Sequence, residues 1–141
     1  MSDEDKEFKA GSTFKQAISF ALQHEAPKDA IEILKIQAKA AEKLEQRHQV
    51  HKCLLSIVTI MLSMGDVVGA QSFFEESMAT DANGFPGTKE AETASMLLQA
   101  YNERDNDALQ KVVSLQIFTF LDNQVAKLAQ KLTIDEDQIE L

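Results

Sequence analysis

Three residues near the middle of the chain are of types that bind metal ions. His48, His51 and Cys53 lie close together in sequence, and imidazole and thiolate groups are common zinc ligands. On a helix the two histidines share a face, whereas Cys53 points elsewhere, and no fourth ligand lies near in sequence. We therefore interpret the histidines as part of a polar helix start and Cys53 as a small buried hydrophobic residue.

Signatures of catalysis are missing from the sequence as well. It contains no glycine-rich phosphate loop and no Gly-x-Ser-x-Gly nucleophile motif. Asp135, Glu136 and Asp137 are adjacent acids in a polar segment, which is not a setting that tunes a carboxyl pKa for acid–base catalysis. The sequence predicts a protein that is not an enzyme and that has no cofactor and no bound metal.

The composition is that of one globular domain with an acidic surface. The chain has 141 residues, of which 44% are hydrophobic and 26% are charged. A formal net charge of −9 argues against nucleic acid or anionic lipid as the main partner. Residues 53–64 form the most apolar window, which is too short to cross a bilayer, and the acidic start is unlike a signal peptide. We therefore expect a soluble intracellular protein.

Apolar residues recur at helical spacing along most of the chain, which predicts an all-α fold of about seven helices. Pro27 is placed to open the second helix, Gly65 to end the third and Asp66 to cap the fourth. The apolar stripe of the second helix is Ile31, Leu34, Ala38, Ala41 and Leu44, and that of one continuous last helix is Leu115, Phe118, Leu121, Val125, Leu128 and Leu132.

The predicted helices form three pairs with a repeating feature. Ala30, Ala70 and Ala108 each lie just inside the second helix of a pair, at a spacing of about 40 residues. A small residue there lets two helices approach closely, and such hairpins must stack on one another to bury their apolar faces. The sequence therefore predicts a TPR-like α-solenoid of stacked antiparallel helical hairpins with a small C-terminal helical bundle.

The same patterns divide the chain into five segments. We expect the first helix to begin at Ser12 or Thr13, after a disordered acidic segment. The segments are the acidic residues 1–10, the TPR-like hairpins of 11–79, a loop at 80–88 with Asn-Gly and Pro-Gly turns, the C-terminal bundle of 89–132 and the acidic tail of 133–141.

Four basic side chains recur every four residues along the second predicted helix. They are Lys35, Lys39, Lys43 and Arg47, and we call them the basic row. Neutralisation by Glu32, Glu42 and Glu45 would make the row an ordinary solvated face. The alternative is a contact surface for an acidic partner, and the residues alone leave both interpretations open.

The acidic tail also has two interpretations. Residues 133–141 contain four acids and end in Leu141. A frayed, solvated end would have this composition. So would a recognition peptide whose acids steer it to a basic groove and whose terminal leucine anchors it there.

The most distinctive stretch of the sequence begins in the loop. It reads NGFPGT at 83–88 and continues at 91–132 as AETASMLLQAYNERDNDALQKVVSLQIFTFLDNQVAKLAQKL, with Phe118, Leu121, Asp122, Asn123, Ala126, Lys127 and Leu128 in its closing helix. This stretch resembles the C-terminal half of the soluble NSF attachment protein (SNAP) family, and the gamma type most. The resemblance extends from about residue 11 to the end, is less specific over 27–79 and is weakest over 1–10.

The resemblance implies a fold and a function. The family folds as a twisted sheet of TPR-like hairpins capped by a small helical bundle. Its members are non-enzymatic adaptors of vesicle-mediated transport, including transport between the ER and the Golgi. They bind the assembled SNARE complex and recruit the AAA ATPase N-ethylmaleimide-sensitive factor (NSF), which then takes the complex apart. A cytoplasmic protein that associates peripherally with endomembranes is therefore expected, with SNARE helices and NSF as partners and no nucleic acid.

The resemblance also implies two binding segments. The family's acidic C-terminal end, with a leucine at or next to the last position, engages and stimulates the ATPase. The matching residues here are Asp135, Glu136, Asp137, Glu140 and Leu141. Family members use basic side chains along the solenoid to contact the acidic SNARE bundle, which makes the basic row a candidate SNARE-binding surface.

Length is where the sequence departs from the family. Family members are much longer, and their additional N-terminal half carries further hairpins and a membrane-attachment loop. We therefore expect incomplete SNARE clasping, an intact ATPase-binding end, and membrane association only through partners or through the missing half. The alternatives are a generic TPR-like peptide-binding scaffold with no role in SNARE recycling, which would tolerate loss of the tail, and an inactive fragment.

Overall fold

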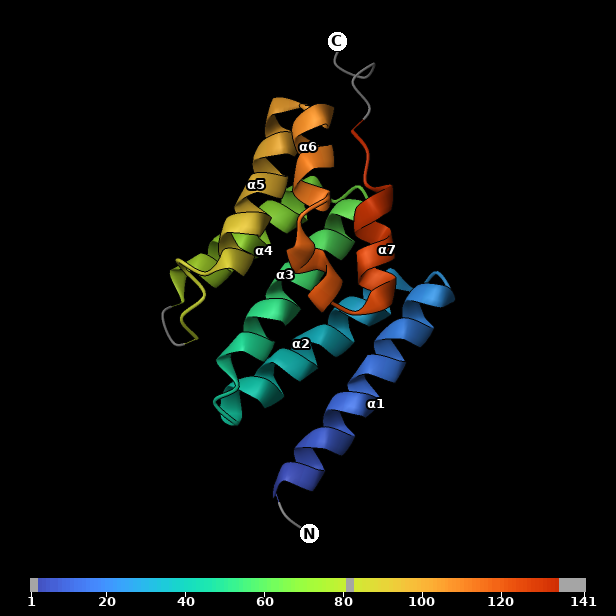
Figure 1. Cartoon of the computed structure of the whole chain (residues 1–141), viewed down its shortest axis with the longest axis vertical. Helices are drawn as coiled ribbons and strands as arrows, with labels where there is room; N and C mark the ends of the chain where they lie inside the picture. Colours follow the sequence, from blue (N-terminus) through green and yellow to red (C-terminus); the bar gives the residue numbers. More distant parts are fainter. Residues whose placement is uncertain (1–2, 81–82, 135–141) are drawn as a thin grey trace.

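The computed structural model describes residues 3–80 and 83–134, with side chains from Thr13 onward. Over these residues the chain forms seven α-helices and one short 3₁₀ helix and contains no strand. The helices follow one another as antiparallel pairs that stack along the molecule (Figure 1). The predicted all-α, TPR-like hairpin solenoid is thereby confirmed.

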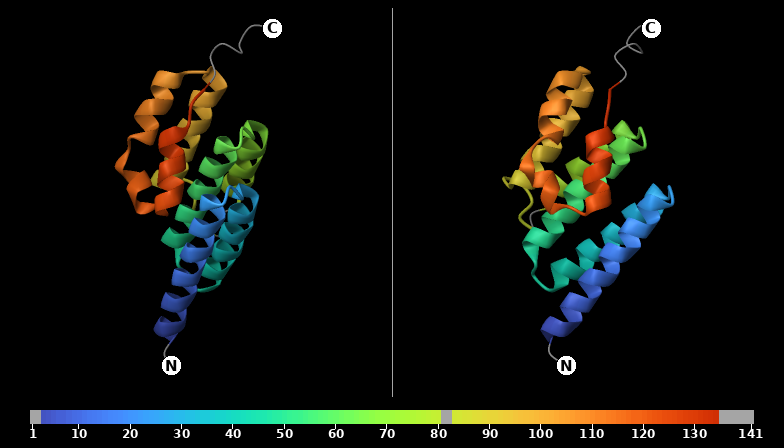
Figure 2. Two further views of the ribbon diagram at one scale, coloured as in Figure 1. Left: turned by 90° about the vertical axis from the view of Figure 1, so that its right-hand side faces the viewer. Right: turned by 45° about the vertical axis from the view of Figure 1, so that its right-hand side comes forward.

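Three hairpins and a closing segment make up the part of the chain that the structure describes. The hairpins are α1 (Asp3–Gln23) with α2 (Pro27–Lys43), α3 (Arg47–Ser63) with α4 (Val67–Ala79), and α5 (Lys89–Glu103) with α6 (Asn106–Val113). The closing segment is the 3₁₀ helix η1 (Gln116–Phe120) followed by α7 (Asn123–Lys131). Figure 2 shows α5, α6, η1 and α7 gathered at the end of the molecule away from the start of α1.

Four of the connecting turns have the same backbone structure. A residue with a positive φ ends each preceding helix, and these residues are Glu25, Glu45, Gly65 and Arg104. The N–H of the next residue then donates to a carbonyl five positions earlier, as in Asp66 to Met61 at 3.0 Å and Asp105 to Ala100 at 2.9 Å. These bonds satisfy carbonyls that the helix end leaves without partners. The repeat is therefore visible in the turns as well as in the helices.

The predicted capping residues occupy these turns. Pro27 begins α2, where its missing N–H leaves no helical hydrogen bond unmade. The Asp66 carboxylate accepts from the Gly69 N–H at 2.9 Å, and Asp105 caps α6 in the same way by accepting from Ala108 at 3.0 Å. These local signals explain why α2 and α4 begin where the sequence predicted.

The core is centred on α3, which contacts α2, α4, α5 and α7. Most of its residues are buried, because helices cover it on several sides. Ala30 and Ala70 are fully buried in the main core cluster, whereas Ala108 is half-buried at its edge. The two helices of a hairpin therefore pack closely at the repeated alanine in the first two hairpins and less closely in the third.

The start of α1 corrects one prediction. The helix begins at Asp3, so residues 3–10 are helical where we expected a disordered segment, and Ser12 and Thr13 are not its start.

The last helix corrects a second prediction. It is interrupted, because Leu115 and Leu121 have extended backbone on either side of η1. The interruption lets Phe118 and Leu121 both reach the core. Two predicted core positions are also wrong: Leu44, at the C-terminal end of α2, and Leu115 are exposed.

Candidate functional site

The basic row lies on two helices. Lys35, Lys39 and Lys43 are on α2, which ends at Lys43, and Arg47 is the first residue of α3. The four-residue spacing predicted a single helix for all four, and the turn at 44–46 corrects that placement. Lys39, Lys43 and Arg47 are exposed, and Lys35 is half-buried.

The row's charges are mostly unpaired within the described part of the chain. Lys35 Nζ lies 3.7 Å from Glu32 Oε1 and 5.9 Å from the centre of the Phe73 ring on α4. Among the described residues, no ion pair joins Lys39, Lys43 or Arg47 to any acid. Among the described residues, a neighbouring glutamate therefore neutralises only Lys35. The charges of Lys39, Lys43 and Arg47 face solvent.

An apolar depression borders the row. A shallow pocket of about 350 Å³ lies between α2 and α4 with α3 as its floor. Lys35 and Lys39 line it together with Ile36 and Phe73, and Ile36 is 58% exposed. Sequence spacing gave no sign of this apolar component, although Ile36 stands directly beside Lys35 in the chain.

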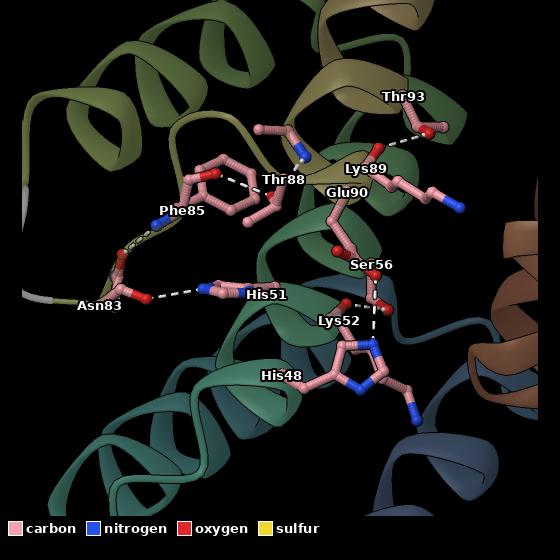
Figure 3. Close-up of polar contacts among 11 residues, drawn as sticks. His48, His51, Lys52, Ser56, Asn83, Phe85, Thr88, Lys89, Glu90 and Thr93 are labelled. Atoms are coloured by element: carbon pink, nitrogen blue, oxygen red, sulfur yellow. Dashed lines mark hydrogen bonds and ion pairs between the residues drawn. The ribbon is translucent and has the colours of Figure 1, made fainter.

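The loop between α4 and α5 is fastened to α3 by a buried aromatic residue (Figure 3). Phe85 is fully buried, with its ring centre 5.9 Å from that of His51 and 6.3 Å from that of Phe74. His51 Nε2 donates to the Asn83 carbonyl at 2.6 Å, and Asn83 Oδ1 accepts from the Phe85 N–H at 3.0 Å. Residues 83–85, where the most specific part of the family resemblance begins, are thus held against α3.

Thr88 ends the loop and begins α5. Its hydroxyl donates to the Phe85 carbonyl at 2.7 Å and accepts from the Ala91 N–H at 3.1 Å. One side chain therefore closes the turn and caps the helix. The loop also lies beside the basic row, since a β-carbon added at Gly84 would stand 3.8 Å from an Arg47 guanidinium nitrogen.

His48, His51 and Cys53 have separate partners. His48 Nε2 lies 3.3 Å from Glu90 Oε2, and the Cys53 thiol donates to Gln37 Oε1 at 3.5 Å. Burial raises the pKa of the Cys53 thiol to about 11, which keeps it protonated near neutral pH. Within the residues described, no three His, Cys, Asp or Glu side chains are grouped so as to hold a metal ion. His51 differs from the prediction, because it is a buried anchor for the loop and not part of a polar helix start.

The end of the described chain is tied to α5 and α6 by hydrogen bonds. The Leu132 carbonyl accepts from Gln110 Nε2 at 3.2 Å, and the Thr133 carbonyl accepts from the Tyr101 hydroxyl at 3.4 Å. The Ile134 N–H donates to Asn106 Oδ1 at 3.4 Å. The candidate ATPase-binding residues lie outside the described residues, and they are Asp135, Glu136, Asp137, Glu140 and Leu141.

Helix length and hydropathy decide whether a helix can cross a membrane. No described helix of this chain is long and apolar enough to span a bilayer.

Comparisons with known proteins identify the family. A family model described as "Soluble NSF attachment protein, SNAP" matches residues 1–130. The chain is 40% identical over 136 residues to the gamma-soluble NSF attachment protein of Dictyostelium discoideum, an alignment that covers 96% of this chain and 41% of that protein. It is 33% identical over 93 residues to the protein of the same name from Arabidopsis thaliana, covering 66% of this chain and 31% of that protein. The chain spans less than half the length of these relatives, and its match from α1 into α7 shows that it belongs to the soluble NSF attachment protein family.

Proposed function

We propose that the chain is a non-enzymatic adaptor that binds SNARE complexes and recruits and stimulates NSF for SNARE disassembly. The observation that carries this proposal is the family match over residues 1–130. The proposed place of action is the cytoplasmic face of endomembranes, reached through the partners, in vesicle-mediated transport. The proposed division of labour assigns SNARE binding to the hairpins of 11–79 and NSF binding to the tail of 133–141, with the loop at 80–88 and the bundle of 89–132 joining them.

The basic row is the proposed SNARE contact. At a rise of about 1.5 Å per residue, Lys35 and Lys43 are about 12 Å apart along α2. A helical partner with acids at four-residue spacing matches that distance. Each exposed pair contributes only about 0.2–1 kcal/mol, so the row acts jointly, mainly by accelerating association and selecting an acidic surface.

Charge reversal tests this contact. In Lys35→Glu/Lys39→Glu/Lys43→Glu, we expect weaker binding to an assembled SNARE bundle and a flatter dependence of affinity on salt. The matched control is Lys28→Glu/Lys89→Glu/Lys111→Glu, which reverses three exposed lysines elsewhere and changes net charge equally. Titration of a fluorescent SNARE bundle measures both variants. Equal loss in both would show that net charge alone matters and would remove the basic row from the proposal.

The acidic tail is the proposed NSF contact. Its acids would steer it to a basic groove, and burial of Leu141 would contribute roughly 1.5–3 kcal/mol. We expect Leu141→Ala to remove most stimulation of NSF ATP hydrolysis while SNARE binding and the melting temperature stay unchanged. A markedly lower melting temperature would instead make Leu141 a core residue.

Deletion of residues 135–141 separates the adaptor from a generic TPR-like scaffold. An adaptor loses NSF stimulation on this deletion and keeps SNARE binding. A scaffold with no role in SNARE recycling is indifferent to the deletion in both assays. Stimulation that survives the deletion would contradict the proposed role of the tail.

A further inference from the structure

A larger pocket opens on a different surface from the basic row. It has a volume of about 540 Å³ and lies between α1 and α3, with α2 as its floor. Its apolar lining includes Phe14 of α1, Leu34 of α2 and Leu44 at the end of α2. This volume is within the range of sites that bury several side chains of a ligand.

The closing segment of the chain borders one end of the pocket. Phe120, Leu121 and Asp122, which directly precede α7, line that end. The helix α7 itself packs on α3 and contacts α1, and the Ser19 hydroxyl of α1 donates to Asp122 Oδ2 at 3.2 Å. A helix of this chain therefore already lies against α3 and α1 where the pocket ends. The open pocket continues the surface on which α7 is seated.

Two large apolar side chains at the pocket are left uncovered. Leu44 is 49% exposed and Phe120 is 59% exposed. They come from separate parts of the chain and line the same cavity. Convergence of exposed apolar residues on one concavity is typical of a binding surface, in contrast to single exposed residues elsewhere.

Among the described residues, two cations and one acid line the pocket. Lys15 of α1 and Lys52 of α3 lie on opposite walls. Neither forms an ion pair among the residues that the structure describes. Asp122, the one acid among the described lining residues, is already engaged, since its carboxylate accepts from Ser19 and caps α7 by accepting from the Gln124 N–H at 2.8 Å. The site offers an apolar floor between two cations.

We propose that this pocket binds one amphipathic helix of a partner protein, end to end with α7, with large apolar residues on its inner face and acids on its flanks. The apolar face covers Leu44 and Phe120, and the flanking carboxylates reach Lys15 and Lys52. The pocket shares no lining residue with the basic row. The proposal therefore does not depend on assigning the row to SNARE binding.

Model peptides provide the probe for this proposal. The first is a fluorescein-labelled helical peptide of about 14 residues, with leucines at i, i+4, i+7 and i+11 and glutamates beside them. The second replaces the glutamates by lysines, and the third scrambles the order of the first. We expect the chain to bind the acidic peptide about tenfold or more tightly than the other two, by fluorescence anisotropy. Equal binding of the three, or no binding below about 1 mM, would overturn the proposal.

Variants locate the binding. We expect Leu44→Ser and Phe120→Ser each to weaken binding of the acidic peptide about tenfold. Val68→Ser is the matched control, because Val68 is 82% exposed on α4 and does not line the pocket. Lys15→Glu/Lys52→Glu should reverse the preference between the acidic and basic peptides. An effect of Val68→Ser equal to that of the pocket variants would contradict the assignment.

Two further measurements on the unmodified chain test where the peptide binds and whether a second copy of the chain occupies the pocket. Amide NMR shifts on peptide addition should concentrate in the segments that line the pocket, around residues 44–56 and 120–122. Shifts concentrated elsewhere would refute the site. Sedimentation should show that the chain does not self-associate through the pocket. A dimer that dissociates in the Phe120→Ser variant would instead show that the pocket is an interface between two copies, and it would overturn the proposal.

Discussion

Phe85 is the residue whose truncation tests most sharply how the loop between α4 and α5 is held. The side chain is fully buried in a small cluster with Ala41, Val50, Leu54 and Ala91. Phe85→Ala removes the ring that contacts His51 and Phe74 and leaves a cavity that rigid helices cannot fill. We therefore expect a loss of about 3–5 kcal/mol in the free energy of unfolding.

The expected loss is large because Phe85 joins several elements at once. The residue comes from the loop, and the side chains around it come from α2, α3, α4 and α5. Two matched controls bracket the result. Phe85→Leu keeps most of the apolar volume and should cost less than about 1.5 kcal/mol, whereas Phe20→Ala, at a position 63% exposed, should change stability by less than about 0.5 kcal/mol.

Urea unfolding followed by circular dichroism measures these variants. The midpoint should fall for Phe85→Ala while the slope of free energy against urea stays constant, which would mean that the unfolding transition is still cooperative. A loss below about 1 kcal/mol would show that the loop is not part of the cooperative core. That result would refute the anchoring role that we assign to Phe85.

Two further predictions concern the repeat and the buried thiol. Ala70→Leu should destabilise the fold by about 1–3 kcal/mol through overpacking, because Ala70 is fully buried. The control Ala79→Leu, at the exposed end of α4, should have little effect. Equal melting temperatures of the two variants would contradict the close packing at Ala70. Burial raises the pKa of the Cys53 thiol from the ordinary value of 9.0 to about 11 in the folded state. The buried, protonated thiol therefore contributes fully to stability below pH 9, and this contribution is lost as the pH rises from 9 to 11. We therefore expect the free energy of unfolding, measured with urea, to fall between pH 8 and pH 10. The fall should be about 1 kcal/mol larger in the unmodified chain than in Cys53→Ala. An equal fall in both would refute burial of the thiol.

The turns were predictable from the sequence because their signals are local. Gly65 followed by Asp66 combines a residue suited to positive φ with a capping carboxylate, and the structure uses both. Pro27 is a local signal of another kind, since it begins α2 at a position where the missing N–H leaves no helical hydrogen bond unmade. The order of the helices follows from these signals and from the apolar spacing.

Other features depend on contacts between distant segments. The break before α7 places Asp122 beside Ser19, which is 103 positions away, and apolar spacing alone gave no sign of it. His51 is buried because its ring donates to a carbonyl 32 positions away in the loop. The pairing of Lys35 with Glu32, and the lack of pairing of Lys39, Lys43 and Arg47 within the described chain, depend on side-chain geometry. Sequence spacing identifies the basic row but does not determine which of its charges are neutralised.

Recruitment of NSF to an immobilised, assembled SNARE complex is the most direct test of the central proposal. Purified NSF would be passed over the complex with no addition, with the chain, or with the chain carrying Leu141→Ala. The adaptor proposal predicts that NSF is retained only when the unmodified chain is present, and that the Leu141→Ala chain stays on the SNARE complex without retaining NSF. Failure of the unmodified chain to retain NSF, or equal retention by the Leu141→Ala chain, would contradict it.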